Sequence, residues 1–85
     1  MFKVFGIFAV RDVKAAVFHQ PFIAPTRAAA VRGFSDAAND RNHEFAKHPE
    51  DYHLYEVGSY DDQTGLVSGV SPISLVAMAS DLQQR

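Results

Sequence analysis

The sequence predicts an α+β domain: a small antiparallel sheet of the order β-β-α-β-β, with one helix packed on one face and room for a short C-terminal helix. Three stretches support this class. Residues 2–11 are almost wholly apolar, residues 27–38 are alanine-rich with apolar side chains at helical spacing, and residues 52–70 contain two strand-like runs around a turn. Strands joined by short turns pair antiparallel and leave one face for a helix. We expect all 85 residues to form one domain.

The first strand is expected to be central, and its two faces differ. Successive side chains of a strand leave by opposite faces. One face would be wholly apolar and consists of Phe2, Val4, Gly6, Phe8 and Val10. The other would be an apolar strip with a cation at each end, formed by Lys3, Phe5, Ile7, Ala9 and Arg11. The first face would cover the core, and the second would cover a ligand or a partner chain.

The next segment is expected to complete a hairpin and then start a helix. Residues 15–19 would be a second strand, and residues 20–25 would leave the ladder because Pro21 and Pro25 lack backbone donors. Thr26 is a good N-cap for a helix over residues 27–38. The helix would bury a stripe formed by Ala30, Val31, Phe34, Ala37 and Ala38. A close approach to the sheet would explain Gly33, which costs about 1 kcal/mol relative to alanine in a helix.

The second half is expected to be a polar loop, a hairpin and a short helix. Residues 41–51 would be the loop, and residues 52–60 a third strand. On that strand Tyr55 and Val57 would share one face, and Leu54, Gly58 and Tyr60 the other. Residues 66–70 would pair back as a fourth strand, and residues 74–82 have the spacing of a short helix.

The composition argues against several classes of protein. The net charge is −2, which does not fit a simple polycationic nucleic-acid binder. The distribution is uneven: residues 1–47 hold seven basic and four acidic residues, a charge of +3, and residues 48–85 hold one basic and six acidic residues, a charge of −5. Folding could gather the cations on one surface or mix the two halves. The absence of cysteine excludes disulfides and thiolate metal sites, and we expect no membrane-spanning segment.

Several runs of residues resemble one family over most of residues 1–75. The longest are Phe-Ser-Asp-Ala-Ala-Asn-Asp at 34–40, Phe-Ala-Lys-His-Pro-Glu-Asp-Tyr at 45–52 and Tyr-Glu-Val-Gly-Ser-Tyr-Asp at 55–61. Shorter ones are Gln-Pro-Phe at 20–22, Thr-Gly at 64–65 and Ser-Pro-Ile-Ser-Leu at 71–75. Together they resemble the small non-structural protein of gokushovirus-type microviruses, phages with a single-stranded DNA genome. Residues 11–17 depart from the family's tighter acidic turn, which leaves the length of the first hairpin open.

The resemblance implies a role in the phage life cycle. The family's protein is similar in assigned role to protein C of the phiX-type phages, which acts at the switch to single-stranded genome synthesis and packaging. The resemblance therefore implies DNA binding, or contact with the replication and packaging machinery, in the cytoplasm of the infected bacterial host. It supplies no mapped active site.

The leading hypothesis is a non-enzymatic, homodimeric protein that binds single-stranded DNA with little sequence preference. Such binding needs cations for phosphates and exposed aromatic rings on which bases stack. The candidate phosphate contacts are Lys3, Arg11, Lys14, Arg27 and Arg32, and the candidate stacking residues are Phe5, Phe22 and Tyr55. The alternative for the first strand is that Phe5 and Ile7 pack against a second subunit.

Other functions have weaker support in the sequence. The metal-ligand types His43, Glu44, His48, Glu50, Asp51 and His53 cluster in the chain, but their spacing fits no zinc motif and a polar turn explains them. No nucleophile elbow or phosphate-cradling loop is present, so we expect no enzyme, no metal and no cofactor. The second hypothesis is an adaptor without direct DNA contact. The face from Lys3 to Arg11 and the segment 75–82 would then dock the replication initiator or the assembling capsid.

Overall fold

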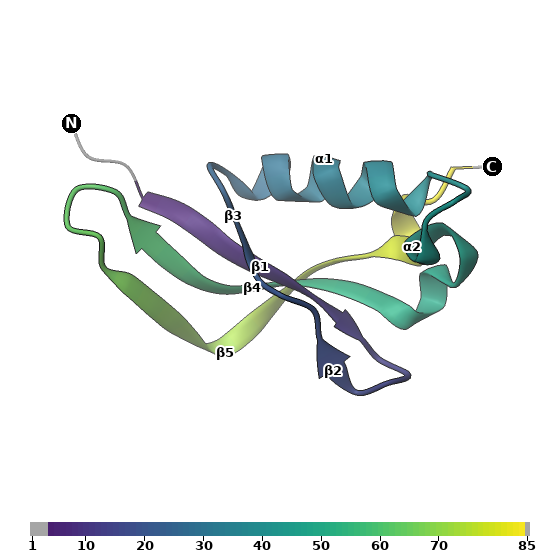
Figure 1. Ribbon diagram of the computed structural model, residues 1–85, viewed down its shortest axis with the longest axis horizontal. Helices are drawn as coiled ribbons and strands as arrows, with labels where there is room; N and C mark the ends of the chain where they lie inside the picture. Colours follow the sequence, from purple (N-terminus) through teal and green to yellow (C-terminus); the bar gives the residue numbers. More distant parts are fainter. Residues whose placement is uncertain (1–3, 85) are drawn as a thin grey trace.

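The structure, a computed structural model that describes residues 4–84, confirms the predicted α+β class. A five-stranded antiparallel sheet carries the helix α1 along one side, and the short helices gather at one end (Figure 1). The elements are, in chain order, β1 Val4–Asp12, β2 Val17–Phe18, β3 Phe22–Ala24, α1 Arg27–Ala38, α2 Glu44–Lys47, the 3-10 helix η1 Pro49–Asp51, β4 Tyr52–Asp61, β5 Val67–Met78 and α3 Ala79–Leu82. Phe2 and Lys3, which the sequence placed on the first strand, lie outside the described residues.

The strand β1 is central, as predicted. Along one edge it pairs with β4, and along the other it pairs first with β3 and then with β2. Its two faces separate as the alternation requires, because Phe8 and Val10 are buried beneath α1 while Phe5 and Ile7 on the other face stay half-buried. β1 therefore divides the molecule into a helix-covered face and an opposite face.

The first hairpin is shorter than predicted, and the segment after it was wrongly expected to leave the sheet. Only Val17–Phe18 pairs back at once, opposite Arg11 and Asp12. Phe22–Ala24 then forms β3 against residues 6–8 of β1. Pro21 and Pro25 flank these three residues, so the donors between them remain available to the ladder. A turn without glycine joins β1 to β2, and its Ala16 takes the left-handed conformation with φ 59°.

The helix α1 has the predicted bounds and cap. The Thr26 hydroxyl accepts a hydrogen bond from the Ala29 amide at 3.0 Å, as an N-cap should. Ala30, Phe34 and Ala38 are buried against the sheet, which confirms the core stripe. The expectation for Gly33 was wrong. Gly33 is exposed, and a Cβ built on it would have nothing within 4 Å.

The segment predicted to be a polar loop contains two short helical turns. The His43 side chain caps α2, its Nδ1 accepting from the Phe45 amide at 3.1 Å. α2 thereby turns Phe45 into the core, with its ring centroid 4.6 Å from that of Tyr52 and 5.4 Å from that of Phe34. A single aromatic residue in a polar segment carries no helical period, so the sequence pattern did not reveal it.

A bulge in β4 reverses the face on which each side chain of the second half of the strand lies. The β1–β4 register shifts between Ile7 and Phe8, so that Val57 has no partner on β1. Tyr55 lies opposite Ala9, and Tyr60 lies opposite Phe5. Directly opposed residues share a face. Tyr55 and Tyr60 are therefore on the same face, whereas uninterrupted alternation wrongly separated them.

The last strand runs further than predicted. β5 is 12 residues long and pairs with β4 up to Met78, so that α3 is one turn instead of the helix expected over residues 74–82. Leu75 lies opposite Tyr55, and this pairing with β4 overrides the helical spacing of the apolar residues. Beyond α3, the side-chain amide of Gln83 donates through Nε2 to the backbone oxygens of Ala38 and Ala46 at 3.3 and 2.8 Å, which ties this segment to α1 and α2.

The main core cluster lies between the sheet and the helices. It is one cluster of buried residues formed by Phe8, Val10, Ala24, Ala30, Phe34, Ala38, Phe45, Tyr52, Leu54 and Ala79. All three α-helices contribute to it, and all three pack on the same face of the sheet. Within residues 4–84, the opposite face has no covering layer.

Candidate nucleic-acid interface

The candidate site is the sheet face that no helix covers within residues 4–84, and we call it the open face. Alternation along β1 and the cross-strand registers place its residues. They are Phe5, Ile7, Ala9 and Arg11 of β1, Phe18 of β2, Ile23 of β3, His53, Tyr55, Gly58 and Tyr60 of β4, and Val67, Gly69, Leu75 and Met78 of β5.

Two aromatic pairs lie on the open face. Phe18 and Tyr55 meet edge to face with ring centroids 5.6 Å apart, and Phe5 and Tyr60 meet at 6.2 Å. Tyr55 lies opposite Ala9 and Tyr60 opposite Phe5, so the pairs are separated by four residues of β1, or about 13 Å. Phe18 is 40% exposed, and the other three rings are half-buried against their neighbours. The open face therefore presents two aromatic pairs with Gly58 between them.

Charged side chains of the strands separate between the two faces. Arg11 lies on the open face with its guanidinium 5.1 Å from the centre of the Phe18 ring, and His53 lies directly opposite Arg11. The described strands carry three carboxylates, those of Asp12, Glu56 and Asp61. Asp12 continues the alternation of the helix-covered face of β1, and Glu56 and Asp61 lie opposite residues of that face, so all three belong to it. Glu56 is held there by an ion pair with Arg27 of α1. The strands thus offer cationic and aromatic groups on the open face and keep their carboxylates away from it.

The structure brings together some of the predicted binding residues and separates others. Phe5, Arg11 and Tyr55 share the open face, and Lys14 is exposed in the turn that follows Arg11. Phe22 lies on the helix-covered face, where its ring stacks on Phe8 at 6.0 Å.

The two predicted arginines of the helix also lie on the covered side. Arg27 and Arg32 are exposed on α1, and Arg27 is engaged with Glu56. Lys3 lies outside the described residues. The predicted residues therefore do not form one continuous surface, and the open face holds three of them.

Sequence reasoning missed Phe18 and Tyr60. Phe18 was not among the predicted stacking residues, and the structure places it opposite Arg11 and hence on the open face. Its face depends on the length of the first hairpin, which the sequence leaves open. Tyr60 was assigned to the wrong face because the bulge at Val57 leaves no mark in the apolar pattern.

The histidine-rich segment is dispersed by the fold. His43 caps α2 and His53 lies on the open face, whereas His48, Glu50 and Asp51 keep their ligand-type atoms within 4.8 Å of one another. These three belong to the turn around η1, and two of them are exposed. The group has the chemistry to hold a cation, and its exposed placement equally suits a solvated turn.

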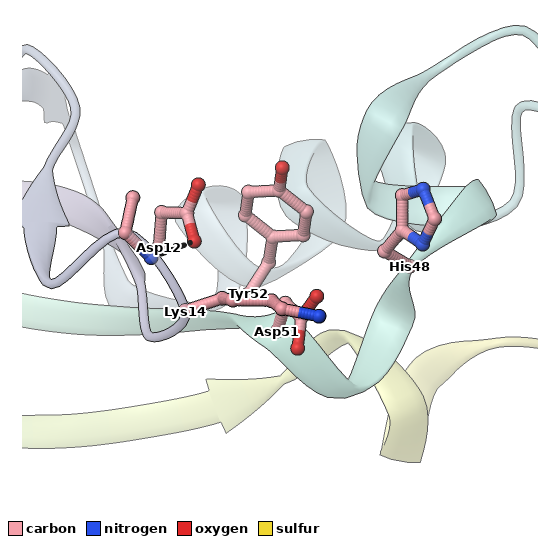
Figure 2. A pocket seen from close by; sticks show the side chains of 6 residues that line it. Asp12, Lys14, His48, Asp51 and Tyr52 are labelled. Carbon is pink, nitrogen blue, oxygen red and sulfur yellow. Dashed lines mark hydrogen bonds between the residues drawn. The ribbon is translucent and has the colours of Figure 1, made fainter.

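A shallow cavity of about 340 Å³ lies beside this group (Figure 2). Asp12, Lys14, His48, Asp51 and Tyr52 line it, and the Asp12 carboxylate is held by the Ala15 amide at 3.0 Å. Burial, followed by the charges of Asp12, Glu44 and Asp51, raises the pKa of the Tyr52 hydroxyl above its usual value of 10.0. Tyr52 therefore stays protonated and neutral well into the alkaline range.

The structure is that of a small α+β protein whose sheet has an aromatic face that no helix covers within residues 4–84. The model of the Phage ORF5 protein family matches residues 5–82. The chain therefore belongs to the Phage ORF5 protein family. No curated protein and no solved structure shows significant similarity to it. Among residues 4–84, no helix is long and apolar enough to cross a membrane.

Proposed function

We propose that this phage protein is a non-enzymatic binder of single-stranded DNA with little sequence preference, and that the open face is its binding surface. The observation that carries the proposal is the placement of the exposed Phe18 ring and the half-buried Tyr55 ring beside Arg11, on a face that lacks strand carboxylates within residues 4–84. Antiparallel sheets that present aromatic side chains to solvent are established platforms for unpaired bases.

The expected binding mode follows from the geometry. Bases would stack on the Phe18–Tyr55 pair and on the Phe5–Tyr60 pair, while Arg11 and Lys14 hold phosphates. Every base has a π face, so stacking tolerates any sequence. Duplex DNA keeps its bases stacked on each other and offers no ring to this face. Two to three phosphate contacts, counting Lys3, would lower log K by roughly 0.7 per contact for each unit of log salt.

The biological setting completes the proposal. Membership of a phage protein family supports a phage role, and the resemblance to gokushovirus-type non-structural proteins points to genome synthesis and packaging. The protein would coat newly made genome strands, or transfer them to the packaging machinery, in the cytoplasm of the infected host.

A second function is favoured by one separate observation. An apolar cavity of about 560 Å³ is lined by Leu82 and by residues of α1, among them Arg27, Val31 and Arg32. Such a groove would suit an adaptor that docks a replication or capsid protein. It lies on the helix-covered side, so the two functions predict different surfaces.

Fluorescence anisotropy of a labelled oligothymidylate tests the proposal against salt and against two matched charge reversals. Arg11→Glu alters the open face, whereas Arg32→Glu makes the same change on exposed α1. We expect salt-sensitive binding that Arg11→Glu abolishes and Arg32→Glu leaves nearly intact. Equal loss in both variants would remove the open face from the proposal, and absence of binding at low salt would remove DNA.

A further inference from the structure

The strand β5 forms an edge of the sheet. The strand order is β2-β1-β4-β5, so β5 pairs with β4 along one side and has no paired strand on its other side within the described chain. The backbone donors and acceptors along that side need water or another strand.

This edge lacks the charges that commonly protect edges. Residues 67–78 include no Asp, Glu, Lys or Arg, whereas natural edge strands are usually protected by charged side chains, especially lysine. Residues 67–75 are all exposed, among them Val67 at 63%, Val70 at 38% and Leu75 at 49%. β5 is thus a long edge strand that carries no charge and exposes the apolar side chains of Val67, Val70 and Leu75, and such an edge favours pairing with another strand.

The interior of a single copy is small. Only Phe8 and Leu54 are large side chains that are fully buried among the described residues. Domains of this size often gain stability by association. Covering the β5 edge would extend the sheet and remove exposed apolar surface from water.

We propose that β5 pairs antiparallel with β5 of a second copy of this chain, through residues 67–71. Residues 67–69 are held in regular pairing with β4 and Pro72 has no backbone donor, so the ladder is centred on Gly69 and placed before the proline. A second copy is the occupant because the strand carries no charge with which to select an oppositely charged foreign strand. Self-pairing about a two-fold axis also uses the same stretch on both sides and closes the assembly.

The symmetry has a consequence for the open face. Antiparallel pairing edge to edge places the two-fold axis perpendicular to the sheet, so both open faces look in the same direction. The dimer would present four aromatic pairs on one continuous sheet. A role in DNA binding for the joined open faces rests on the proposed function, whereas the pairing of β5 does not.

Light scattering on a sizing column tests the pairing without DNA. We expect the wild type to elute with twice the 9.4 kDa of one chain. Val70→Lys should give a folded monomer because it places a charge on each side of the two-fold axis. Val13→Lys adds the same charge at a valine that is 42% exposed in the first turn and should leave the dimer intact. A monomeric wild type, or a dimer that withstands Val70→Lys, overturns the proposal.

Cross-linking provides an independent readout that does not require a destabilised variant. The chain contains no cysteine, and pairing over residues 67–71 places residue 69 of one copy directly opposite residue 69 of the other, so Gly69→Cys introduces one thiol at the proposed axis. Mild oxidation should convert Gly69→Cys to a disulfide-linked dimer and leave Val13→Cys monomeric on a denaturing gel. Equal cross-linking of both variants contradicts the pairing.

Oligonucleotides of two lengths separate this inference from the proposed function. Relative to Ala28→Lys, which adds the same charge at an exposed position of α1 away from the open face, the Val70→Lys protein should bind a short oligonucleotide equally and a long one more weakly, because only the dimer spans both open faces. Loss of the dimer with no DNA binding at any length would sustain the pairing and refute the DNA function. A monomeric wild type that binds DNA would do the reverse.

Discussion

Replacing Gly58 with alanine is expected to destabilise the protein through a contact that can be located atom by atom. A Cβ built on Gly58 would lie 2.5 Å from the backbone oxygen of Ser68 and 3.4 Å from its carbonyl carbon. These are main-chain atoms of β5, so no side chain can rotate away to relieve the clash. The backbones of β4 and β5 would have to move apart at Gly58, in the middle of the open face.

The magnitude follows from the cost of overpacking. Inserted methyl groups in packed sites cost about 1–3 kcal/mol, and 1 kcal/mol corresponds to about 4–8 °C in Tm for a domain of this size. We expect Gly58→Ala to lower the free energy of unfolding by about 2 kcal/mol and Tm by about 8–16 °C. Urea denaturation and differential scanning calorimetry measure the two quantities.

Two other glycines provide matched controls for the same chemical change. Gly69 lies directly opposite Gly58, and its Cβ would meet only the Val57 oxygen at 4.0 Å, so Gly69→Ala should be nearly neutral. Gly33 is exposed within α1 with nothing within 4 Å, so Gly33→Ala should stabilise by about 1 kcal/mol. A Gly58→Ala protein as stable as Gly69→Ala would refute the reasoning.

Three further predictions concern the cap, the buried tyrosine and the stacking surface. Thr26→Ala should lower the free energy of unfolding by about 1 kcal/mol, since the Ala29 amide loses its acceptor; equal urea midpoints for both proteins would contradict the cap. The raised pKa of Tyr52 means that the folded state holds its proton more tightly than the unfolded chain, so stability should be full below pH 10 and fall as pH rises through the folded value. Tyr52→Phe should weaken that alkaline decline, which unfolding curves taken on either side of pH 10 would show. Tyr55→Ala should weaken oligonucleotide binding roughly 5- to 150-fold, the loss of about 1–3 kcal/mol from one stacked base, whereas Phe22→Ala should leave affinity unchanged if its fold is intact.

The parts of the fold that follow from local pattern were predictable from the sequence. The alternation in residues 2–11 identified a central strand with one buried face, and Thr26 with the stripe from Ala30 to Ala38 gave the helix and its bounds. In these segments the period of the apolar residues, the capping chemistry and the tertiary packing all agree.

The parts that depend on pairing between distant residues were not predictable in the same way. β3 forms because β1 supplies three partners between two prolines, and β5 extends to Met78 because β4 is beside it. The bulge at Val57 exchanges the faces of Gly58 and Tyr60 without any change in composition. Local periodicity carries no information about register, so each of these features required the structure.

The candidate site shows the same division. Phe5 and Arg11 could be placed together because they share one strand, and the structure places Tyr55, another predicted stacking residue, on the same face. The cations Arg27 and Arg32 could not be placed, because nothing local shows which side of a sheet a helix covers. The structure therefore narrows the candidate phosphate contacts and adds Phe18 and Tyr60 to the stacking surface.

The most direct test of the central claim is a methyl-labelled NMR titration of the protein with an oligothymidylate. Ile7, Ile23 and Leu75 report on the open face, and Val31 and Leu82 report on the helix-covered side. The proposal predicts shift changes that saturate with DNA at the first three methyl positions and are absent at the other two. Changes confined to Val31 and Leu82, or none at all, would contradict a DNA-binding open face.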